Sequence, residues 1–263
     1  MNIKNKKPKI AIISLTSCEG CEIAVLDLGE RLIKVLGNVE LINFKYMMDA
    51  EVANLKGCDI AFVEGSPVNN RDIKLLKEVR KNSKKIIALG NCAHLGGVQK
   101  IKNYGDKEKI AKYVYKMYKE IENNDGSGID KYIKIDSVIP GCPINKEEFL
   151  KCCLNVLAGR EFKITENPVC YECLNSGYEC LLQNGQICMG PVTIGGCDAI
   201  CLKSKQACWG CRGVLPEVDV GAVHEPSHRA CPNVNKMQNL KKKLQSIAGK
   251  ENIDGVEEIF GVK

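Results

Sequence analysis

The stretch that decides the fold is KIAIISLTSCEGCEIAVLDLGERL, residues 9–32. It begins with an apolar run that predicts a buried strand, and a helical pattern then extends from Cys21 to about Leu36, where Gly37 ends it. Cys18 and Cys21 lie at the junction. Because Cys-x-x-Cys occurs in thiol–disulfide couples, zinc sites and iron–sulfur sites, this pair alone leaves all three chemistries open.

The alternation of strand and helix continues through the first 160 residues. Further strands are predicted at residues 39–47, 58–65, 85–90 and 132–140, and helices at residues 70–81, 105–122 and 145–159. Apolar strands alternating with amphipathic helices predict an α/β fold, a parallel sheet with helices on both faces. In such sheets ligands bind outside the carboxyl ends of the strands.

Four cysteines follow the carboxyl ends of three predicted strands. Cys18 and Cys21 follow the first strand. Cys92, in GNCAHLGG, follows the fourth, and Cys142, in PGCP, follows the fifth. We therefore expect four thiols at one edge of the sheet. The glycines beside Cys92 would allow the backbone to approach inorganic sulfide closely, and His94 is either a neighbour of such a site or an ordinary loop histidine.

The second half of the chain has a different character. After about Lys163 the periodicity fades, and short polar turns are punctuated by cysteine. A segment so poor in aliphatic residues needs metal in order to fold. Its eight cysteines form two quartets, separated by Gly190 and Pro191: Cys170, Cys173, Cys180 and Cys188, then Cys197, Cys201, Cys208 and Cys211. Two zinc sites are also chemically possible there.

Iron–sulfur ligation explains these cysteines best. Tetrahedral zinc would need a second pair near Cys18 and Cys21, and a redox couple would leave Cys92 and Cys142 unexplained. Iron–sulfur clusters take four thiolates from dispersed loops. We also expect the free N–H groups at the start of the first helix to face an anionic cluster.

Four of the sixteen cysteines remain outside the three quartets. Cys58, Cys152 and Cys153 are interpreted as small buried residues. Cys231 lies near His224 and His228, which together imitate a metal site, but a structural loop is the favoured interpretation.

Composition limits the classes of function. The formal charge of +6 comes from lysines scattered over helix faces, and the chain has few aromatic residues, so no nucleic-acid partner is expected. Three anionic clusters would offset this charge. No apolar run is long enough to span a membrane, and no export signal is seen. We expect a cytoplasmic protein without a membrane partner, in a compartment that disfavours disulfides.

The motifs TSCEGCE, GNCAHLGG, PGCP, CMGPVT and ACWGCRG, in this order, resemble the small, electron-transferring subunit of [NiFe] hydrogenases. The spacing is most similar to the delta subunit of sulfhydrogenases and the gamma subunit of methyl-viologen-reducing hydrogenases. The resemblance implies a flavodoxin-like, doubly wound parallel sheet over residues 1–160. A small irregular iron–sulfur domain with a C-terminal tail would follow over residues 161–263.

The resemblance also assigns ligands to three [4Fe-4S] clusters. The proximal cluster would be held by Cys18, Cys21, Cys92 and Cys142, the distal cluster by Cys170, Cys173, Cys180 and Cys188, and the medial cluster by Cys197, Cys201, Cys208 and Cys211. Many periplasmic members have histidine where this chain has Cys170.

The same resemblance implies that the chain itself has no catalytic residue. The nickel–iron site would belong to a separate large subunit, and electrons would pass to a flavin- and iron–sulfur-containing acceptor module, either NADP-linked or heterodisulfide-reductase-linked. Cluster subunits of complex I or membrane hydrogenases are the alternative, but they lack a second cluster domain like residues 165–211. A zinc-binding module is a further alternative.

Overall fold

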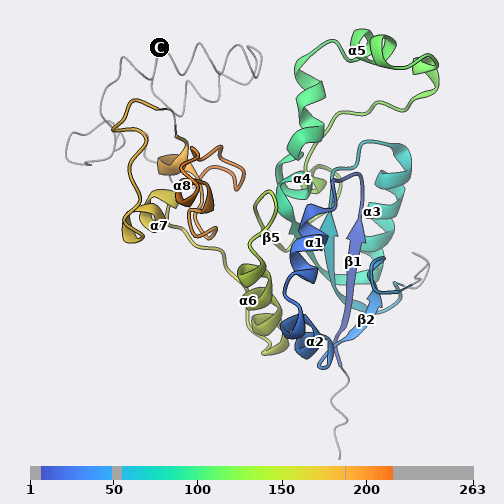
Figure 1. Ribbon diagram of the computed structural model, residues 1–263. Coiled ribbons are helices and arrows are strands. Elements are labelled where there is room, and N and C mark those ends of the chain that lie inside the picture. Colours follow the sequence, from blue (N-terminus) through green and yellow to red (C-terminus); the bar gives the residue numbers. More distant parts are fainter. Residues whose placement is uncertain (1–6, 49–54, 187, 216–263) are drawn as a thin grey trace, which may run out of the picture. The chain divides into compact units, whose positions relative to one another are not determined.

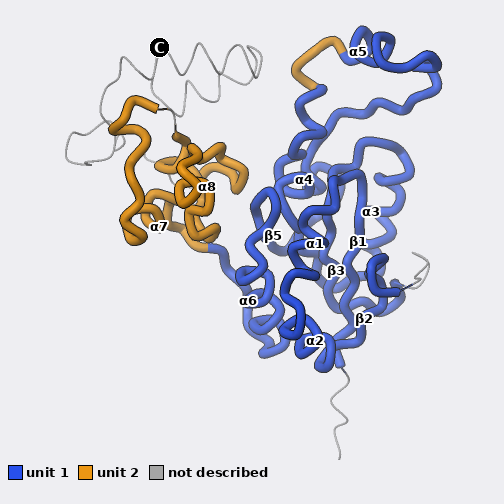
Figure 2. The backbone as a smooth tube through the Cα atoms, in the orientation of Figure 1, with its two compact units in different colours: residues 1–102, 107–164 blue, residues 103–106, 165–263 orange. Residues whose placement is uncertain are grey.

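The computed structural model describes residues 7–48, 55–186 and 188–215 of the 263. The chain forms two compact units, which are coloured separately in Figure 2. The first comprises residues 1–102 and 107–164, and the second comprises residues 103–106 and 165–263. The sequence predicts a change of character at residues 160–163.

The first unit contains a five-stranded parallel sheet with the order β2-β1-β3-β4-β5. This order is that of flavodoxin-like doubly wound folds, so the predicted fold class is confirmed. The strands are β1 (Lys9–Ser14), β2 (Glu40–Asn43), β3 (Cys58–Glu64), β4 (Ser83–Leu89) and β5 (Ser137–Ile139).

Helices cover both faces of this sheet (Figure 1). On one face lie α1 (Gly20–Leu26), α2 (Glu30–Leu36) and α6 (Lys146–Leu157), and on the other lie α3 (Asn70–Asn82) and α4 (Gly90–Leu95). A further helix, α5 (Lys107–Val114), lies away from the sheet (Figure 1). Successive residues of β1 enter different cores because strand side chains alternate. Ile10 and Ile12 pack with α1, α2 and α6, whereas Ala11 and Ile13 pack with α3 and α4.

Several predicted elements differ from the observed ones. The strand predicted over 39–47 is limited to β2. The predicted helix from Cys21 to Leu36 is broken into α1 and α2, because Gly29 adopts a positive φ of 55° between them. The predicted helix over 105–122 ends at Val114, and a short 3-10 turn, Tyr118–Glu120, follows. Of the predicted strand over 132–140, only Ser137–Ile139 pairs with β4.

The segment GNCAHLGG is also not a loop. The chain passes from β4 directly into α4, so Cys92 lies inside a helix. Gly90, with φ +81°, makes the sharp turn between the two elements. Gly96, with φ +96°, ends the helix and donates its N–H to the Cys92 carbonyl oxygen. A strand that continues without a connecting loop into a short helix leaves little periodicity for sequence analysis to detect.

The second unit has little regular structure. It contains α7 (Val169–Asn175), a 3-10 turn at Gly190–Val192 and α8 (Ile200–Lys203). Its core includes Cys173 and Cys208 together with a few aliphatic side chains, and further cysteines pack partly buried around it. Thiols thus supply much of the interior of this unit. The predicted helix near residues 235–249, as well as Cys231, His224 and His228, lie outside the described residues.

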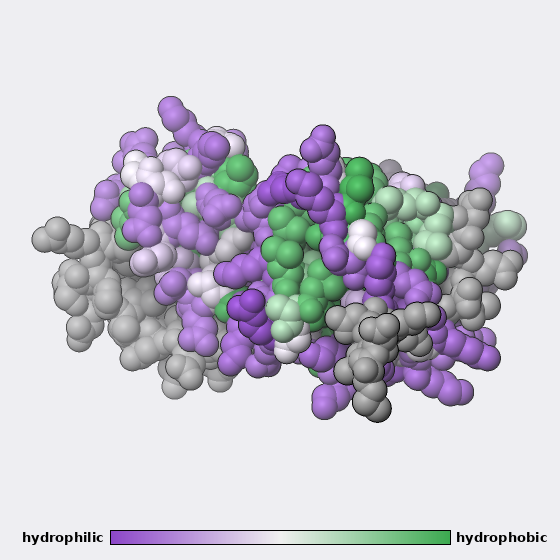
Figure 3. Space-filling view, turned by 90° about the horizontal axis from the view of Figure 1, so that it is seen from below, coloured by the Kyte–Doolittle hydropathy of each residue, from purple (hydrophilic) through white to green (hydrophobic). Residues whose placement is uncertain are grey.

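The surface mixes hydrophilic and apolar residues. Figure 3 shows apolar patches surrounded by hydrophilic residues on one face. Large exposed apolar side chains include Tyr113 in the first unit and Trp209 in the second, with exposed fractions of 92% and 74%. Within the described residues, no helix combines the length and the apolar character that crossing a membrane requires.

Candidate metal centres

The first candidate centre lies where β1, β4 and β5 end. Cys18 precedes α1, Cys21 lies in its first turn, Cys92 lies in α4, and Cys142 follows β5. The four thiols are near enough to affect one another. Burial raises the pKa of Cys92 first, and Cys142 and Cys18 raise it further. Burial likewise raises the pKa of Cys142, and Cys18 adds to this effect. The structure thus brings together the four cysteines expected at the sheet edge.

Two glycines leave the space that these thiols occupy. A Cβ atom on Gly90 would lie 2.3 Å from Cys21 Sγ, and one on Gly97 would lie 2.5 Å from Cys92 Sγ. Both distances are far below van der Waals contact, so neither position accepts a side chain without displacing a sulfur. These glycines therefore bring the backbone close to cysteine sulfur. Their close approach to inorganic sulfide stays a prediction.

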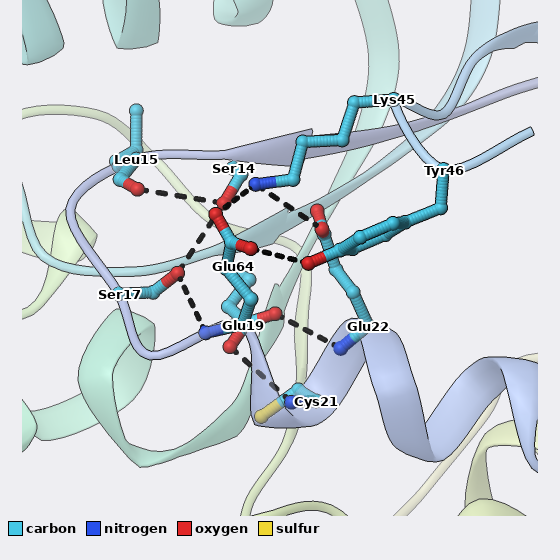
Figure 4. Close-up of polar contacts among 9 residues, drawn as sticks. All are labelled: Ser14, Leu15, Ser17, Glu19, Cys21, Glu22, Lys45, Tyr46 and Glu64. Atoms are coloured by element: carbon cyan, nitrogen blue, oxygen red, sulfur yellow. Dashed lines mark hydrogen bonds and ion pairs between the residues drawn. The ribbon is translucent and has the colours of Figure 1, made fainter. Parts of the chain in front are cut away.

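Glu64, at the end of β3, fixes the start of α1. Its carboxylate is buried and accepts N–H hydrogen bonds from Cys21 (3.3 Å) and Glu22 (3.0 Å), as Figure 4 shows. Burial raises the pKa of Glu64, and these two N–H donors oppose the rise. The expectation that free N–H groups here face a cluster is therefore wrong for Cys21 and Glu22, because Glu64 accepts both bonds.

Two side chains that follow β2, Lys45 and Tyr46, contact the CEGCE motif of residues 18–22 (Figure 4). Lys45 and Tyr46 both donate to the carboxylate of Glu19, and these bonds lower the pKa of Glu19. Lys45 Nζ also lies 3.6 Å from Oε2 of the fully buried Glu22. The pKa of Glu22 is raised to about 7, because burial outweighs the opposing effect of Lys45. Both acidic residues of the CEGCE motif are thus engaged with Lys45.

In the second unit, the first quartet lines a small apolar pocket. Cys170, Cys173, Cys180 and Cys188 all contribute to it, together with Val169, Leu181, Leu182, Gly190 and Leu202. The pKa of Cys170 is raised to about 12, chiefly by burial and in addition by the three other cysteines of this quartet. A Cβ atom on Gly190 would lie 3.2 Å from Cys170 Sγ and 3.5 Å from Cys188 Sγ, so this glycine also leaves room for sulfur.

The second quartet of this unit includes Cys201, which lies in α8. The pKa of Cys197 is raised to about 11, chiefly by burial; Glu172 and Cys211 contribute to the rise, whereas Arg212 opposes it. Cys208 interacts electrostatically with Cys201 and also with Cys188 of the neighbouring quartet. The N–H of Cys208 donates to Cys188 Sγ at 3.4 Å. The two quartets of the second unit are therefore in direct contact.

The other described cysteines lie away from these centres. Cys58, Cys152 and Cys153 are buried in the two hydrophobic cores of the first unit, as predicted. Burial raises the pKa of each thiol, to about 12 for Cys153. They are therefore protonated and inert near neutral pH. No disulfide joins the fifteen cysteines within the described ranges.

These features fit iron–sulfur clusters. The donor atoms are sulfur only, which is the ligand set that such clusters use. Buried thiols carry raised pKa values without metal, and binding to iron replaces their protons with cationic charge. Gly90, Gly97 and Gly190 leave space beside the sulfur atoms. His94, at the C-terminal end of α4, is half-buried.

Comparison with known proteins agrees with this chemistry. Residues 18–156 match the family described as NADH ubiquinone oxidoreductase, 20 Kd subunit. The delta subunit of sulfhydrogenase 2 from Pyrococcus furiosus is 32% identical over 241 residues, covering 91% of this chain and 99% of that protein. The chain belongs to the hydrogenase small-subunit family. The subunits of this family are iron–sulfur electron-transfer proteins of oxidoreductases.

Two further members show how far the likeness extends. A vhu-type F420-non-reducing hydrogenase of Methanocaldococcus jannaschii has a subunit that is 32% identical, covering 81% of this chain and 85% of that protein. A chain in the crystal structure of an NAD⁺-reducing [NiFe]-hydrogenase is 25% identical with a TM-score of 0.54, covering 61% of this chain and 96% of that chain. The sulfhydrogenase likeness extends into the cysteine-rich second unit, which the 20 Kd family match does not include.

One residue of the first centre was missed by sequence analysis. The cysteines were found because their spacing is visible in the sequence. Glu64 was missed because it contacts Cys21 from 43 residues away along the chain. An acidic residue at the end of the otherwise apolar strand CDIAFVE was the available sign, since a buried carboxylate needs nearby donors.

Proposed function

We propose that this chain carries electrons through three [4Fe-4S] clusters between the nickel–iron site of a large subunit and an electron-acceptor module. The observation that carries the proposal is the gathering of four thiols at one sheet edge, from the segments that follow β1, β4 and β5. Eight more thiols gather in the second unit. Each cluster, when bound, would accept and release electrons one at a time.

The proposed ligands follow the three quartets. The proximal cluster is assigned to Cys18, Cys21, Cys92 and Cys142, the distal cluster to Cys170, Cys173, Cys180 and Cys188, and the medial cluster to Cys197, Cys201, Cys208 and Cys211. The contact between Cys208 and Cys188 supports neighbouring medial and distal sites. The protein's own tasks are to supply thiolates, to leave space beside them and to exclude water.

Exposure of the first quartet supports a partner at the proximal site. Cys18 and Cys142 are exposed, whereas Cys21 and Cys92 are buried, so this centre opens to the surface of the first unit. A large subunit that covers this opening would exclude water from the cluster and exchange electrons with it directly.

The acceptor is proposed to be a flavin- and iron–sulfur-containing module. One relative is named an NAD⁺-reducing hydrogenase and another an F420-non-reducing hydrogenase. The first name favours a pyridine-nucleotide-linked acceptor, and the second is equally compatible with one linked to heterodisulfide reductase.

The electron path is tested by removing one proximal ligand. In the complex with the large subunit, Cys142→Ala should lower hydrogen-dependent dye reduction by at least about tenfold, because loss of a ligand costs at least as much as loss of an outer-shell partner. Hydrogen–deuterium exchange at the nickel–iron site should persist. Cys58→Ala removes a thiol buried in the core and should leave dye reduction unchanged. Full dye reduction by Cys142→Ala would refute the assignment.

A further inference from the structure

Glu172 belongs to one quartet by sequence and contacts the other in space. It lies on α7 between Cys170 and Cys173. Its carboxylate accepts N–H hydrogen bonds from Gly196 and from Ala199, the latter at 3.1 Å. Oε2 of Glu172 also lies 3.8 Å from Cys197 Sγ. An acidic side chain from the distal segment therefore holds the loop that carries the first medial cysteine.

Arg212 contacts the same loop with the opposite charge. It directly follows Cys211 and is fully buried. Its Nε donates to the carbonyl oxygens of Ile194, at 3.1 Å, and Gly195, at 2.7 Å. The segment from Ile194 to Ala199 is thus bonded to a carboxylate through its N–H groups and to a guanidinium through its carbonyls. Both charges act on Cys197, in opposite directions.

We propose that Glu172 and Arg212 form a pair of opposed charges that positions Cys197 and sets the reduction potential of the medial cluster. The inference rests on the proposed function, since it assumes a cluster at Cys197, Cys201, Cys208 and Cys211. Both residues are positioning residues, because neither is a ligand.

The direction of each effect follows from charge. Reduction adds an electron to an already anionic cluster, so a nearby carboxylate disfavours the reduced form and a nearby guanidinium favours it. The charge of Glu172 therefore lowers the medial potential, and that of Arg212 raises it. A glutamine at position 172 would keep one hydrogen-bond acceptor for the loop. Its amide N–H can also donate to Cys197 sulfur, which raises the potential further.

The test is a redox titration of the full chain, purified anaerobically and followed by electron paramagnetic resonance. The medial signal is identified as the one changed in Cys201→Ala, which removes a proposed medial ligand. Glu172→Gln should raise the midpoint potential of that signal, and Arg212→Gln should lower it. Glu166→Gln removes an exposed carboxylate of the same unit and should shift nothing.

The iron content of each variant shows whether its medial cluster is still bound, so that an effect of charge on the potential can be distinguished from a misfolded site. If Glu172→Gln binds full iron and its medial potential is unchanged, the inference is wrong. If that variant loses iron, Arg212→Gln and Arg212→Lys decide, since only the lysine variant keeps a positive charge. A lower potential in Arg212→Gln than in Arg212→Lys supports the inference, and equal potentials overturn it. If the wild-type chain binds no medial cluster, the proposed function fails as well.

Discussion

At the scale of single residues, the space beside each thiol determines whether a cluster can be held. Gly90 and Gly97 both adopt positive φ and both approach a cysteine sulfur of the first centre. Two separate constraints therefore favour glycine at these positions: the positive φ of the backbone and the short distance to the neighbouring sulfur. Elsewhere in the first unit, Gly57 is under the first constraint only: its φ is positive, but nothing lies within 4 Å of its would-be Cβ.

The prediction at this scale distinguishes the effect of backbone strain from the effect of contact with sulfur. Gly90→Ala should cost the chain one cluster, seen as a loss of about four irons per chain. The new methyl group would lie 2.3 Å from Cys21 Sγ. Gly57→Ala imposes similar strain at φ +73° and should reduce stability by about 1 kcal/mol. Its iron content should equal that of the wild type. Full iron in Gly90→Ala would show that the sulfur can move aside.

Residues differ in how far their roles can be predicted from sequence. The cysteines were predictable because Cys-x-x-Cys spacing and strand ends place them. Glu64, Glu172 and Arg212 were not, since their partners are brought to them by folding. Glu172 illustrates the difficulty, because its place between Cys170 and Cys173 associates it with the distal quartet, whereas its carboxylate contacts Gly196 and Ala199.

At the scale of secondary structure, the parallel sheet was predictable because β1, β3 and β4 each contain a continuous apolar run of four residues. The length of the fifth strand was overestimated, since only Ser137–Ile139 of the predicted residues 132–140 pairs with β4. Just before that strand, Asp136 ties it to β4. Its Oδ2 accepts the N–H of Ile86 at 2.8 Å and contacts Arg80 Nη1 at 2.8 Å. The Asp136 side chain therefore links the two strands just before the first backbone pair between β4 and β5.

The prediction at this scale concerns acid stability. Burial alone would raise the pKa of Asp136, but the Ile86 N–H and Arg80 together lower it. A lowered pKa stabilises the fold above the unfolded-state value of about 3.9, and the stabilisation is lost as the pH falls. Asp136→Asn should therefore cost about 1 kcal/mol at pH 7, since the carboxylate is partly exposed.

Chemical denaturation at several pH values measures this effect. The difference between Asp136→Asn and the wild type should shrink as the pH falls below about 4. The exposed Asp27 provides a control, and Asp27→Asn should show little difference at any pH. A stability difference for Asp136→Asn that stays constant down to about pH 3 would contradict a role for its charge.

At the scale of the whole molecule, the two units differ in the interactions that stabilise each of them internally. The first unit has two aliphatic cores, one on each face of the sheet. The second has one small core rich in cysteine. The sequence indicated this contrast, because the periodic pattern of apolar residues fades after about Lys163 and cysteines become frequent. It could not supply the details of the second unit, because a chain with so few periodic elements is ordered by side-chain contacts and metal rather than by repeating patterns.

The most direct test is the metal and sulfide content of the full chain, purified without oxygen. Three [4Fe-4S] clusters predict about twelve irons and about twelve inorganic sulfides per chain, with broad absorbance near 400 nm. Iron and sulfide would be quantified alongside zinc on the same sample. Stoichiometric zinc with only traces of iron and sulfide would contradict the assignment of these cysteines to an electron-transfer path.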